Sequence, residues 1–462
     1  MDKKRSSFSG TLGFVLAAAG SAVGLGNIWR FPFITAKDGG GIFLLVYLIL
    51  LLTFGYTLLT AEIAIGRMTR QSPLTAYGAV NKKWKALGLL ACTVPVIITP
   101  YYSVIGGWVF QYFFEFLSGN GLLAAEDGYF SGFITSGWGP LVMFGIFISI
   151  TIAIEALGVE KGIEKASRIL MPFLIVLVIV IAIYSLTVSF TDADGTIRTG
   201  LQGAKYYLIP DFSKITLSSL FKTIMDAMGQ MFYSISVAMG IMIAYGSYMK
   251  DETGIVKSVN EIQFFDTAVA FLAGLMIVPA VFTFMGPDGM SAGPGLMFVS
   301  LPKVFASMGT IGTLIGILFF LMVIFAALTS SVSLMEAVVS SFCDRFSIPR
   351  KKSVLLTSVI FVIIGVLVCL GYNVLYFDIA LPNGTTGQLL DILDYFSNNV
   401  LMPMLSLLTC ILVGYAAGID KVKEEVTKCG FKFSREKLFT VMTKYIAPVL
   451  LFLILLQAFG VF

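Results

Sequence analysis

The sequence predicts an all-α polytopic membrane protein with about eleven transmembrane helices. Of its 462 residues, 57% are hydrophobic and only 13% are charged, whereas soluble proteins carry about 25% charged residues. Apolar stretches of about twenty residues, the length that crosses a bilayer as a helix, recur along the whole chain. We expect spans at residues 11–31, 41–66, 88–118, 139–157, 168–190, 218–247, 264–285, 310–342, 354–373, 388–416 and 441–462.

The first span is interrupted by the segment GSAVGLGNIWRFP at residues 20–32. A glycine in a helix interior costs about 1 kcal/mol relative to alanine, so Gly20, Gly24 and Gly26 together favour a break. Within a membrane, the backbone groups that a break frees are tolerated only where they line a cavity or are covered by protein. The break therefore indicates a binding site made of backbone. Gly20 and Gly24 also have the spacing of close helix packing, an alternative that this segment alone leaves open.

Two further spans carry small and polar residues near mid-membrane depth. The sixth contains GQMFYSISVAMG, in which Ser234 and Ser236 are compatible with a second broken helix. Serines that bond back to an intact helix would give the same sequence. The eighth contains Thr329 and Ser330, whose hydroxyl oxygens suit a hard cation such as Na⁺, although Ser and Thr also join membrane helices in packing.

Ionisable residues inside spans are candidate functional residues because burying them is costly. Those in this chain are Glu62, Asp226, Asp266, Glu336, Asp394 and Arg30. Asp266 has no neighbouring base in the sequence, which predicts a cation or a proton as its partner. Glu62 and Glu336 fit equally well as structural partners of exposed helix ends.

Composition and charge argue against several other classes of protein. The chain has no histidine, and its five cysteines are scattered, so neither a metal cluster nor an enzyme is expected. If the N-terminus is cytoplasmic, most of the 31 Lys and Arg fall on the inner side. We expect a multi-pass protein of the inner (plasma) membrane with an extracellular C-terminus. The net charge of +4 then reflects orientation, and nucleic acid is not an expected partner. A channel would need a continuous polar pore, whereas polarity here concentrates at mid-span breaks.

Five motifs occur in order along the chain: GSAVGLGNIWRFP, DGGG at residues 38–41, the Tyr101–Tyr102 pair, GQMFYSIS and ALTSS. Together they resemble the neurotransmitter:sodium symporter family, particularly its bacterial amino-acid transporters, over essentially the whole chain. The resemblance implies one transmembrane domain, residues 1–462, with a 5+5 inverted repeat and broken helices 1 and 6. Repeat one would cover about residues 8–190, repeat two about 216–416, and an extra helix about 441–462.

The implied activity is sodium-coupled import of an amino acid by alternating access, with two Na⁺ sites. One Na⁺ would bind Ala22, Asn27, Ser234, Asp266 and the substrate carboxylate. The other would bind the carbonyls of Gly20, Val23 and Ala326 and the hydroxyls of Thr329 and Ser330. A non-transporting amino-acid sensor on the same scaffold is the alternative.

The resemblance implies that the substrate carboxylate meets the first Na⁺, the N–H groups of Leu25 and Gly26 and the Tyr102 hydroxyl, which fits the rule that half-helix N-termini attract anions. The resemblance implies substrate contacts with Ala22, Gly24, Leu25, Gly26, Tyr102, Tyr233, Ser234, Ser236, Met239, Ser330 and Leu334. Gly24 stands where monoamine carriers have an aspartate, which favours a free α-amino acid. Met239, a flexible thioether in place of a phenylalanine, favours hydrophobic or aromatic substrates such as Tyr, Trp, Phe or Leu. Another small α-amino acid is the alternative.

Chloride is not expected to be required. Animal members of the family place a serine at the position of Ala270, four residues after the one that Asp266 occupies. Tyr47, Gln230, Ser234 and Asp266 would line the chloride position, so the Asp266 carboxylate supplies the negative charge itself.

The resemblance also implies gates on both sides of the site. The outer pair would be Arg30–Asp394, closing over Tyr233, and the inner pair Arg5–Asp344. Gly162 and Pro172 match an element at the inner end of span five that lets the helix unwind. Expected partners are a free amino acid, the lipid bilayer and a second copy of the chain in a homodimer.

Overall fold

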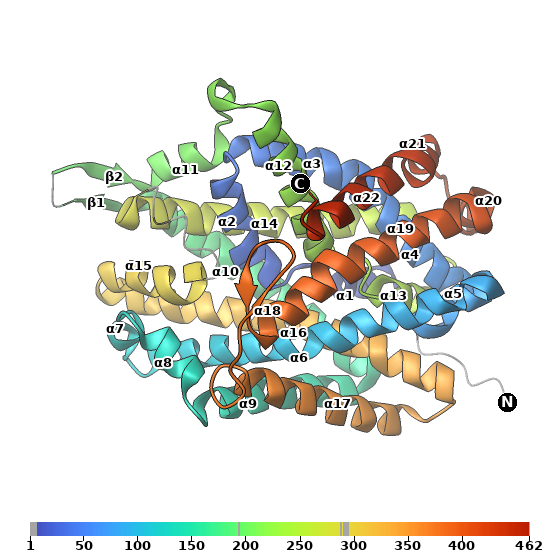
Figure 1. Cartoon of the computed structure of the whole chain (residues 1–462), viewed down its shortest axis with the longest axis horizontal. Helices are drawn as coiled ribbons and strands as arrows, with labels where there is room; N and C mark the ends of the chain where they lie inside the picture. The colour runs from blue at the N-terminus through green and yellow to red at the C-terminus, as the bar shows by residue number, and fades with distance from the viewer. Residues whose placement is uncertain (1–6, 193–194, 287–288, 290–294, 462) are drawn as a thin grey trace.

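A computed structural model describes residues 7–192, 195–286, 289 and 295–461. In this part of the chain the long helices lie roughly side by side (Figure 1). Two short antiparallel hairpins lie in connections between helices: β1 (Ser189–Thr191) with β2 (Ile197–Thr199), and β3 (Ile379–Ala380) with β4 (Thr386–Gly387). The predicted all-α polytopic fold is confirmed.

The first span is broken where the glycines predict it. Helix α1 (Thr11–Ala22) ends at Val23, whose backbone is extended. The chain becomes helical again in the π-helical segment η1 (Gly26–Arg30), which continues into α2 (Phe31–Lys37). The two parts are bent by 54°. This break exposes backbone N–H and C=O groups in the middle of the bundle.

The sixth span is broken as well. Helix α12 (Leu217–Ser234) and helix α13 (Ile241–Tyr248) are separated by turns in which Ser236 and Ala238 have φ of 53° and 61°. Such left-handed backbone costs on the order of 1–3 kcal/mol per non-glycine residue, so tertiary contacts must hold it. One of them is Glu62, a buried carboxylate that accepts a hydrogen bond from the Ala238 N–H at 2.8 Å. Glu62 is therefore a structural partner of exposed backbone, which is one of the two roles, functional or structural, that the sequence left open.

Nine further helices in the described residues are long and apolar enough to cross a membrane. They are α3–η2–α4 (Gly41–Leu50, Leu51–Gly55, Tyr56–Thr69), η3–α6 (Lys82–Trp84, Lys85–Leu117), α9 (Gly139–Ala156), η4–α10 (Val159–Glu164, Lys165–Thr187), α14 (Ile255–Met285), α16 (Thr310–Phe346), α17 (Arg350–Leu370), α18–η8–α19–η9 (Leu389–Asp394, Tyr395–Leu401, Met402–Ile411, Leu412–Ala416) and α21–η11–α22 (Glu436–Val441, Met442–Ile446, Ala447–Ala458). With the two broken spans they match the eleven predicted positions. The predicted starts at residues 168 and 264 are too late, because both helices begin in charged turns before their apolar part.

Short elements connect the spans at the two ends of the bundle. They are α5 (Pro73–Val80), α7 (Gly121–Ala124), α8 (Tyr129–Thr135), α11 (Gly200–Leu208), η5 (Phe212–Lys214), η7 (Leu296–Ser300), α15 (Leu301–Ser307), α20 (Ile419–Val426) and η10 (Lys428–Gly430). In Figure 1, α7, α8, α15 and the β1–β2 hairpin lie at the left end, whereas α5 and α20 lie at the right.

Helix α16 forms the centre of the bundle. It packs against α1, α6, α9, α10 and α17, and every residue from 326 to 341 is buried. A helix buried on all sides has no lipid-facing stripe. The hydroxyl groups of its middle turns therefore face other helices.

A carboxylate pair lies at the end of the first span. Burial and then the neighbouring Asp226 raise the pKa of Asp38 to about 7, although Lys37 and Lys222 act to lower it. Lys37 Nζ lies 3.3 Å from Asp226 Oδ2. Because the folded-state pKa is raised, the stabilisation from protonated Asp38 is present at low pH and is lost as the pH rises through about 7.

We therefore expect Asp38→Asn to raise the melting temperature of the purified protein more at pH 8 than at pH 5. Thermal unfolding at the two pH values measures this difference. Asp127→Asn, at an exposed carboxylate paired with Lys303, controls for simple loss of a charge. An equal effect of Asp38→Asn at both pH values would contradict the pKa assignment.

Candidate functional site

The two breaks meet around one carboxylate. Asn27 from the first break donates to Asp266 Oδ1 at 2.6 Å and to Ser234 Oγ at 2.9 Å. Ser234, the last residue of α12, donates to the same carboxylate at 2.8 Å. Tyr47 OH donates to Asp266 Oδ2 at 3.3 Å. Three residues predicted to share one Na⁺ thus lie within hydrogen-bond distance of one another.

Asp266 is fully buried, with 0% of its surface exposed. Its hydrogen-bond partners, Asn27, Ser234 and Tyr47, are all neutral. No Lys or Arg in the described chain forms an ion pair with it. A buried carboxylate without a cationic side chain is costly, and carboxylate, hydroxyl and carbonyl oxygens are the ligands that hard cations prefer. The residues present therefore fit a small cation.

A second cluster of oxygens joins the end of α1 to α16. Ser330 Oγ donates to the carbonyls of Ser21 at 2.9 Å and Val23 at 3.5 Å. Thr329 Oγ1 donates to the Ala326 carbonyl at 3.0 Å. Gly20 lies beside Thr329. All five residues predicted for the second Na⁺ site are gathered here, and the oxygens they offer are neutral.

A small cavity of about 20 Å³ lies beside the first break. It is lined by Ser21, Ala22, Gly24, Gly26, Ile98, Tyr102, Tyr233, Ser236, Met239, Ile241, Ser330 and Leu334. All but two of the predicted substrate contacts are among them. The exceptions are Leu25, whose N–H lies 3.2 Å from Tyr102 OH, and Ser234, which bonds Asp266 instead. A volume near that of one water means that an amino acid would require these side chains to move apart.

Neighbouring side chains approach residues 24 and 26 so closely that only glycine fits at either position. A Cβ atom on Gly24 would lie 2.6 Å from Ser330 Oγ, and one on Gly26 would lie 2.3 Å from the Tyr233 ring. An aspartate at residue 24 would therefore fill the cavity. These contacts are compatible with both interpretations of the glycines, close packing and a binding site, and the binding role stays a prediction.

The cavity is also lined by Ser21, Ile98 and Ile241, which were not predicted from the sequence. Ser21 adjoins the predicted break, and Ile98 lies four residues before Tyr102, on the same helix face. Ile241 opens α13 directly after the second break. Helical spacing from Tyr102 could have identified Ile98.

A larger cavity of about 420 Å³ lies beyond Tyr233 and is lined by both Arg30 and Asp394. The predicted outer pair is not formed, however. The Arg30 guanidinium stacks 5.5 Å from the centre of the Tyr233 ring. Asp394 instead accepts from Tyr101 OH at 3.1 Å and from Asn398 at 2.6 Å. Because each residue is engaged elsewhere, the direct Arg30–Asp394 ion pair is not formed in this structure, and their role as an outer gate stays a prediction.

Near the end of α16, Asp344 accepts from the Ser72 N–H at 2.7 Å. Its predicted partner Arg5 lies outside the described residues. The chain just before α1 is held by Glu164, which bonds the backbone N–H of Ser9 at 2.9 Å and pairs with Arg168. The segment around Gly162 is the π-helical η4, and Pro172 lies inside α10. A Cβ on Gly162 would lie 2.1 Å from the Ile154 carbonyl oxygen.

The other intramembrane acids have partners of their own. Glu336 and Glu155 are both fully buried and both contact the Arg350 guanidinium. Glu336 also accepts from Tyr248 OH at 2.5 Å. Glu336 is thus an ion-paired residue of the bundle and does not cap a helix end. Asp266 differs from Glu155 and Glu336 in having only neutral hydrogen-bond partners, as Glu62 and Asp394 also do.

Comparison with known proteins agrees with this arrangement. Residues 5–124 and 136–462 match the sodium:neurotransmitter symporter family. The uncharacterised sodium-dependent transporter YhdH of Bacillus subtilis is 32% identical, over 100% of this chain and 99% of that protein. An uncharacterised sodium-dependent transporter of Methanocaldococcus jannaschii is 34% identical over 96% of this chain and 88% of its own. The crystal structure of MhsT in complex with L-phenylalanine superposes with a TM-score of 0.85 at 34% identity, covering 98% and 100% of the two chains.

These matches extend over nearly the whole chain, and their names describe transporters and not enzymes. The buried Asp266 carboxylate between the two broken helices suits a small cation, and the matched proteins are named as sodium-dependent. The chain therefore belongs to the sodium:neurotransmitter symporter family and is a sodium-dependent membrane transporter.

Proposed function

We propose that the protein imports a hydrophobic or aromatic α-amino acid together with Na⁺. The observation that carries this proposal is the fully buried Asp266, which has only neutral partners and lies beside the exposed backbone of two broken helices. The structural similarity to MhsT, which was crystallised with L-phenylalanine, supports the substrate class.

Two Na⁺ ions bind in this proposal. The first is held by the Ala22 carbonyl, Asn27, Ser234 and Asp266, and the second by the cluster around Thr329 and Ser330. The Asp266 carboxylate neutralises the charge of the first ion. The second ion binds only neutral carbonyl and hydroxyl oxygens. Selection of Na⁺ over divalent ions follows from this low ligand charge, because divalent sites usually combine several carboxylates.

The amino acid lies between the two ions. Its carboxylate binds the first Na⁺, the N–H groups of Leu25 and Gly26, and the Tyr102 hydroxyl. Its side chain enters the space bordered by Ile98, Met239 and Leu334, which is apolar and therefore favours hydrophobic groups. Ser236 and Ser330 contribute the polar wall of the same space.

Transport follows alternating access between two inverted repeats, residues 8–190 and 216–416. Na⁺ and substrate shift the equilibrium only through their different affinities for the outward-open and inward-open states. Arg30, Tyr233 and Asp394 control the outer side, and pairing of Arg30 with Asp394 accompanies substrate closure. On the inner side, Arg5 with Asp344 and the segment from Gly162 to Pro172 control release. The N-terminus is cytoplasmic and the C-terminus extracellular in the plasma membrane.

A thermal-shift screen of the twenty amino acids on the purified protein tests the substrate. We expect Phe, Tyr, Trp and Leu to raise the melting temperature in NaCl but not in KCl, because ligands that bind the folded state stabilise it. Absence of any amino-acid effect in NaCl would contradict the proposed substrate class. Equal effects in both salts would contradict sodium coupling.

Chloride independence rests on the Asp266 carboxylate. Sodium-driven uptake into vesicles should be equal in sodium chloride and sodium gluconate. Asp266→Ser should lose uptake in gluconate and recover part of it in chloride, since an external anion can replace the missing charge among Tyr47, Gln230 and Ser234. Loss of wild-type uptake in gluconate would contradict this role.

Gly24→Ala tests the cavity geometry. The new Cβ would lie 2.6 Å from Ser330 Oγ, so we expect amino-acid binding to weaken at least about tenfold, equivalent to about 1.4 kcal/mol. Gly145→Ala in α9 is the matched control, because its Cβ would meet nothing within 4 Å. Equilibrium binding of labelled phenylalanine measures both variants. Unchanged affinity for Gly24→Ala would place the substrate elsewhere.

A further inference from the structure

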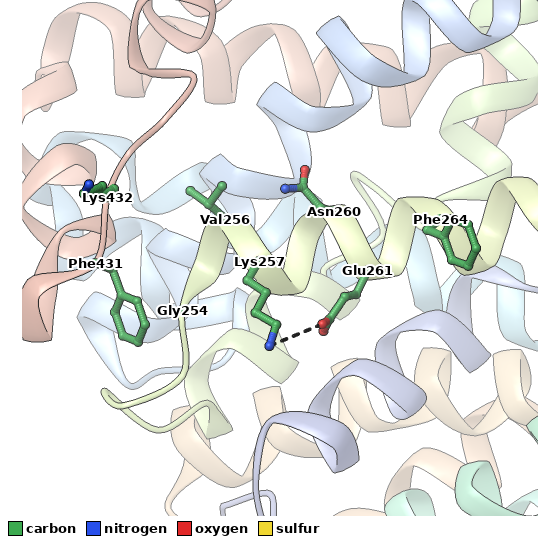
Figure 2. A pocket seen from close by; sticks show the side chains of 8 residues that line it. All are labelled: Gly254, Val256, Lys257, Asn260, Glu261, Phe264, Phe431 and Lys432. Atoms are coloured by element: carbon green, nitrogen blue, oxygen red, sulfur yellow. Dashed lines mark ion pairs between the residues drawn. The ribbon is translucent and has the colours of Figure 1, made fainter.

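A cavity of about 390 Å³ lies at the N-terminal end of α14, and it shares no lining residue with the central cavity. Its walls include Lys257, Asn260, Glu261 and Phe264 of α14, together with Phe431 and Lys432 of the chain that follows η10. Figure 2 shows these side chains around the gap between α14 and that segment. The cavity thus joins two parts of the chain that are far apart in sequence.

Positive charge dominates this cavity. Lys432 is exposed and forms no ion pair with any described residue, and Lys257 reaches only Glu261, at 3.8 Å (Figure 2). Arg435 adds a third positive charge next to the wall. Its guanidinium donates to Asn260 Oδ1 and stacks 4.1 Å from the centre of the Tyr56 ring.

Nearby acids do not neutralise these groups. Asp251 is paired with Arg70 and Lys428, and Glu436 is paired with Lys423. Glu425 lies buried against Arg67, with Nε and Oε1 2.6 Å apart. The lining therefore offers an anion two exposed lysines, with Arg435 next to it, against the carboxylate of Glu261, and the exposed Glu252 lies two residues before the lining Gly254.

The same cavity has an apolar side that continues into the membrane-spanning part of α14. Phe264 is 69% exposed, and it follows Lys257 by seven residues, which is about 10 Å along the helix. Leu52 of η2, whose carbonyl accepts from Arg435, is 44% exposed. Because α14 crosses the membrane, such exposed side chains face acyl chains.

A basic cavity that continues into an apolar surface suits a phospholipid, which has an anionic head group and apolar acyl chains. We propose that this cavity binds the phosphate head group of an anionic phospholipid through Lys257, Lys432 and Arg435, with an acyl chain along Phe264. Basic pockets between spans on the cytoplasmic side commonly hold such head groups. This assignment uses the proposed cytoplasmic orientation of this end but not the identity of the amino-acid substrate.

Binding would connect α14, which carries Asp266, to the segment between η10 and α21. The lipid is therefore expected to stabilise the folded protein without touching the central site.

The test measures lipid binding by the full-length, delipidated protein in detergent. Native mass spectrometry and thermal unfolding are compared after adding phosphatidylglycerol or phosphatidylcholine with identical acyl chains. We expect phosphatidylglycerol alone to be retained and to raise the melting temperature. Lys257→Gln with Lys432→Gln should weaken this response about thirtyfold, the effect of two lysines at an anionic surface.

Three controls make the outcome decisive. Lys82→Gln with Lys83→Gln removes two exposed lysines elsewhere, and should leave the lipid response within about twofold. Lys257→Arg with Lys432→Arg should retain it, which separates charge from folding. Glycerol phosphate, which lacks acyl chains, should not reproduce the stabilisation.

Equal loss in both glutamine variants, or a full response in Lys257→Gln with Lys432→Gln, would overturn the site. An equal response to glycerol phosphate would mean that the cavity binds a soluble anion, and it would overturn the proposal that the ligand is a phospholipid. The amino-acid screen in NaCl is independent of these readouts, so failure of the lipid proposal is distinguishable from failure of the proposed transport.

Discussion

The structure depends most on the buried carboxylate of Asp266. It lies inside the bundle with neutral hydrogen-bond partners, and an uncompensated charge in that position costs several kcal/mol. A bound cation removes this cost, and the backbone that the two broken helices expose offers further oxygens for it. The same residues can therefore link ion binding to the relative position of α1, α12 and α14. This linkage is what a transporter needs, because coupling requires that one ligand change the affinity for the other.

The features that the sequence predicted best are those fixed by local physics. Gly20, Gly24 and Gly26 identify the first break because glycine destabilises a helix wherever it lies. The left-handed Ser236 and Ala238 could not be predicted from their neighbours, because Glu62 holds that turn from 176 residues away in the chain. For the same reason the sequence left the role of Glu62 open. The early starts of α10 and α14 were missed because hydropathy does not detect charged first turns.

The candidate site was predictable as a set of residues but not as a geometry. Residues of five separate segments meet around Asp266 and Thr329, and three of those segments carry the motifs. The sequence could not give the size of the cavity, nor the fact that Arg30 stacks on Tyr233 while Asp394 bonds Tyr101 and Asn398. Those contacts depend on which of several states the bundle adopts. An ion pair between two residues that line one cavity is a property of a state and not of a sequence.

The central claim is that Na⁺ and an amino-acid carboxylate share the space between the two breaks. The most direct test is an experimental structure of the protein with Na⁺ and L-phenylalanine. The account predicts a cation ligated by Asp266, Asn27 and the substrate carboxylate, with the carboxylate also bound by the Leu25 N–H. A substrate bound away from the breaks, or an Asp266 carboxylate without a cation beside it, would contradict the account.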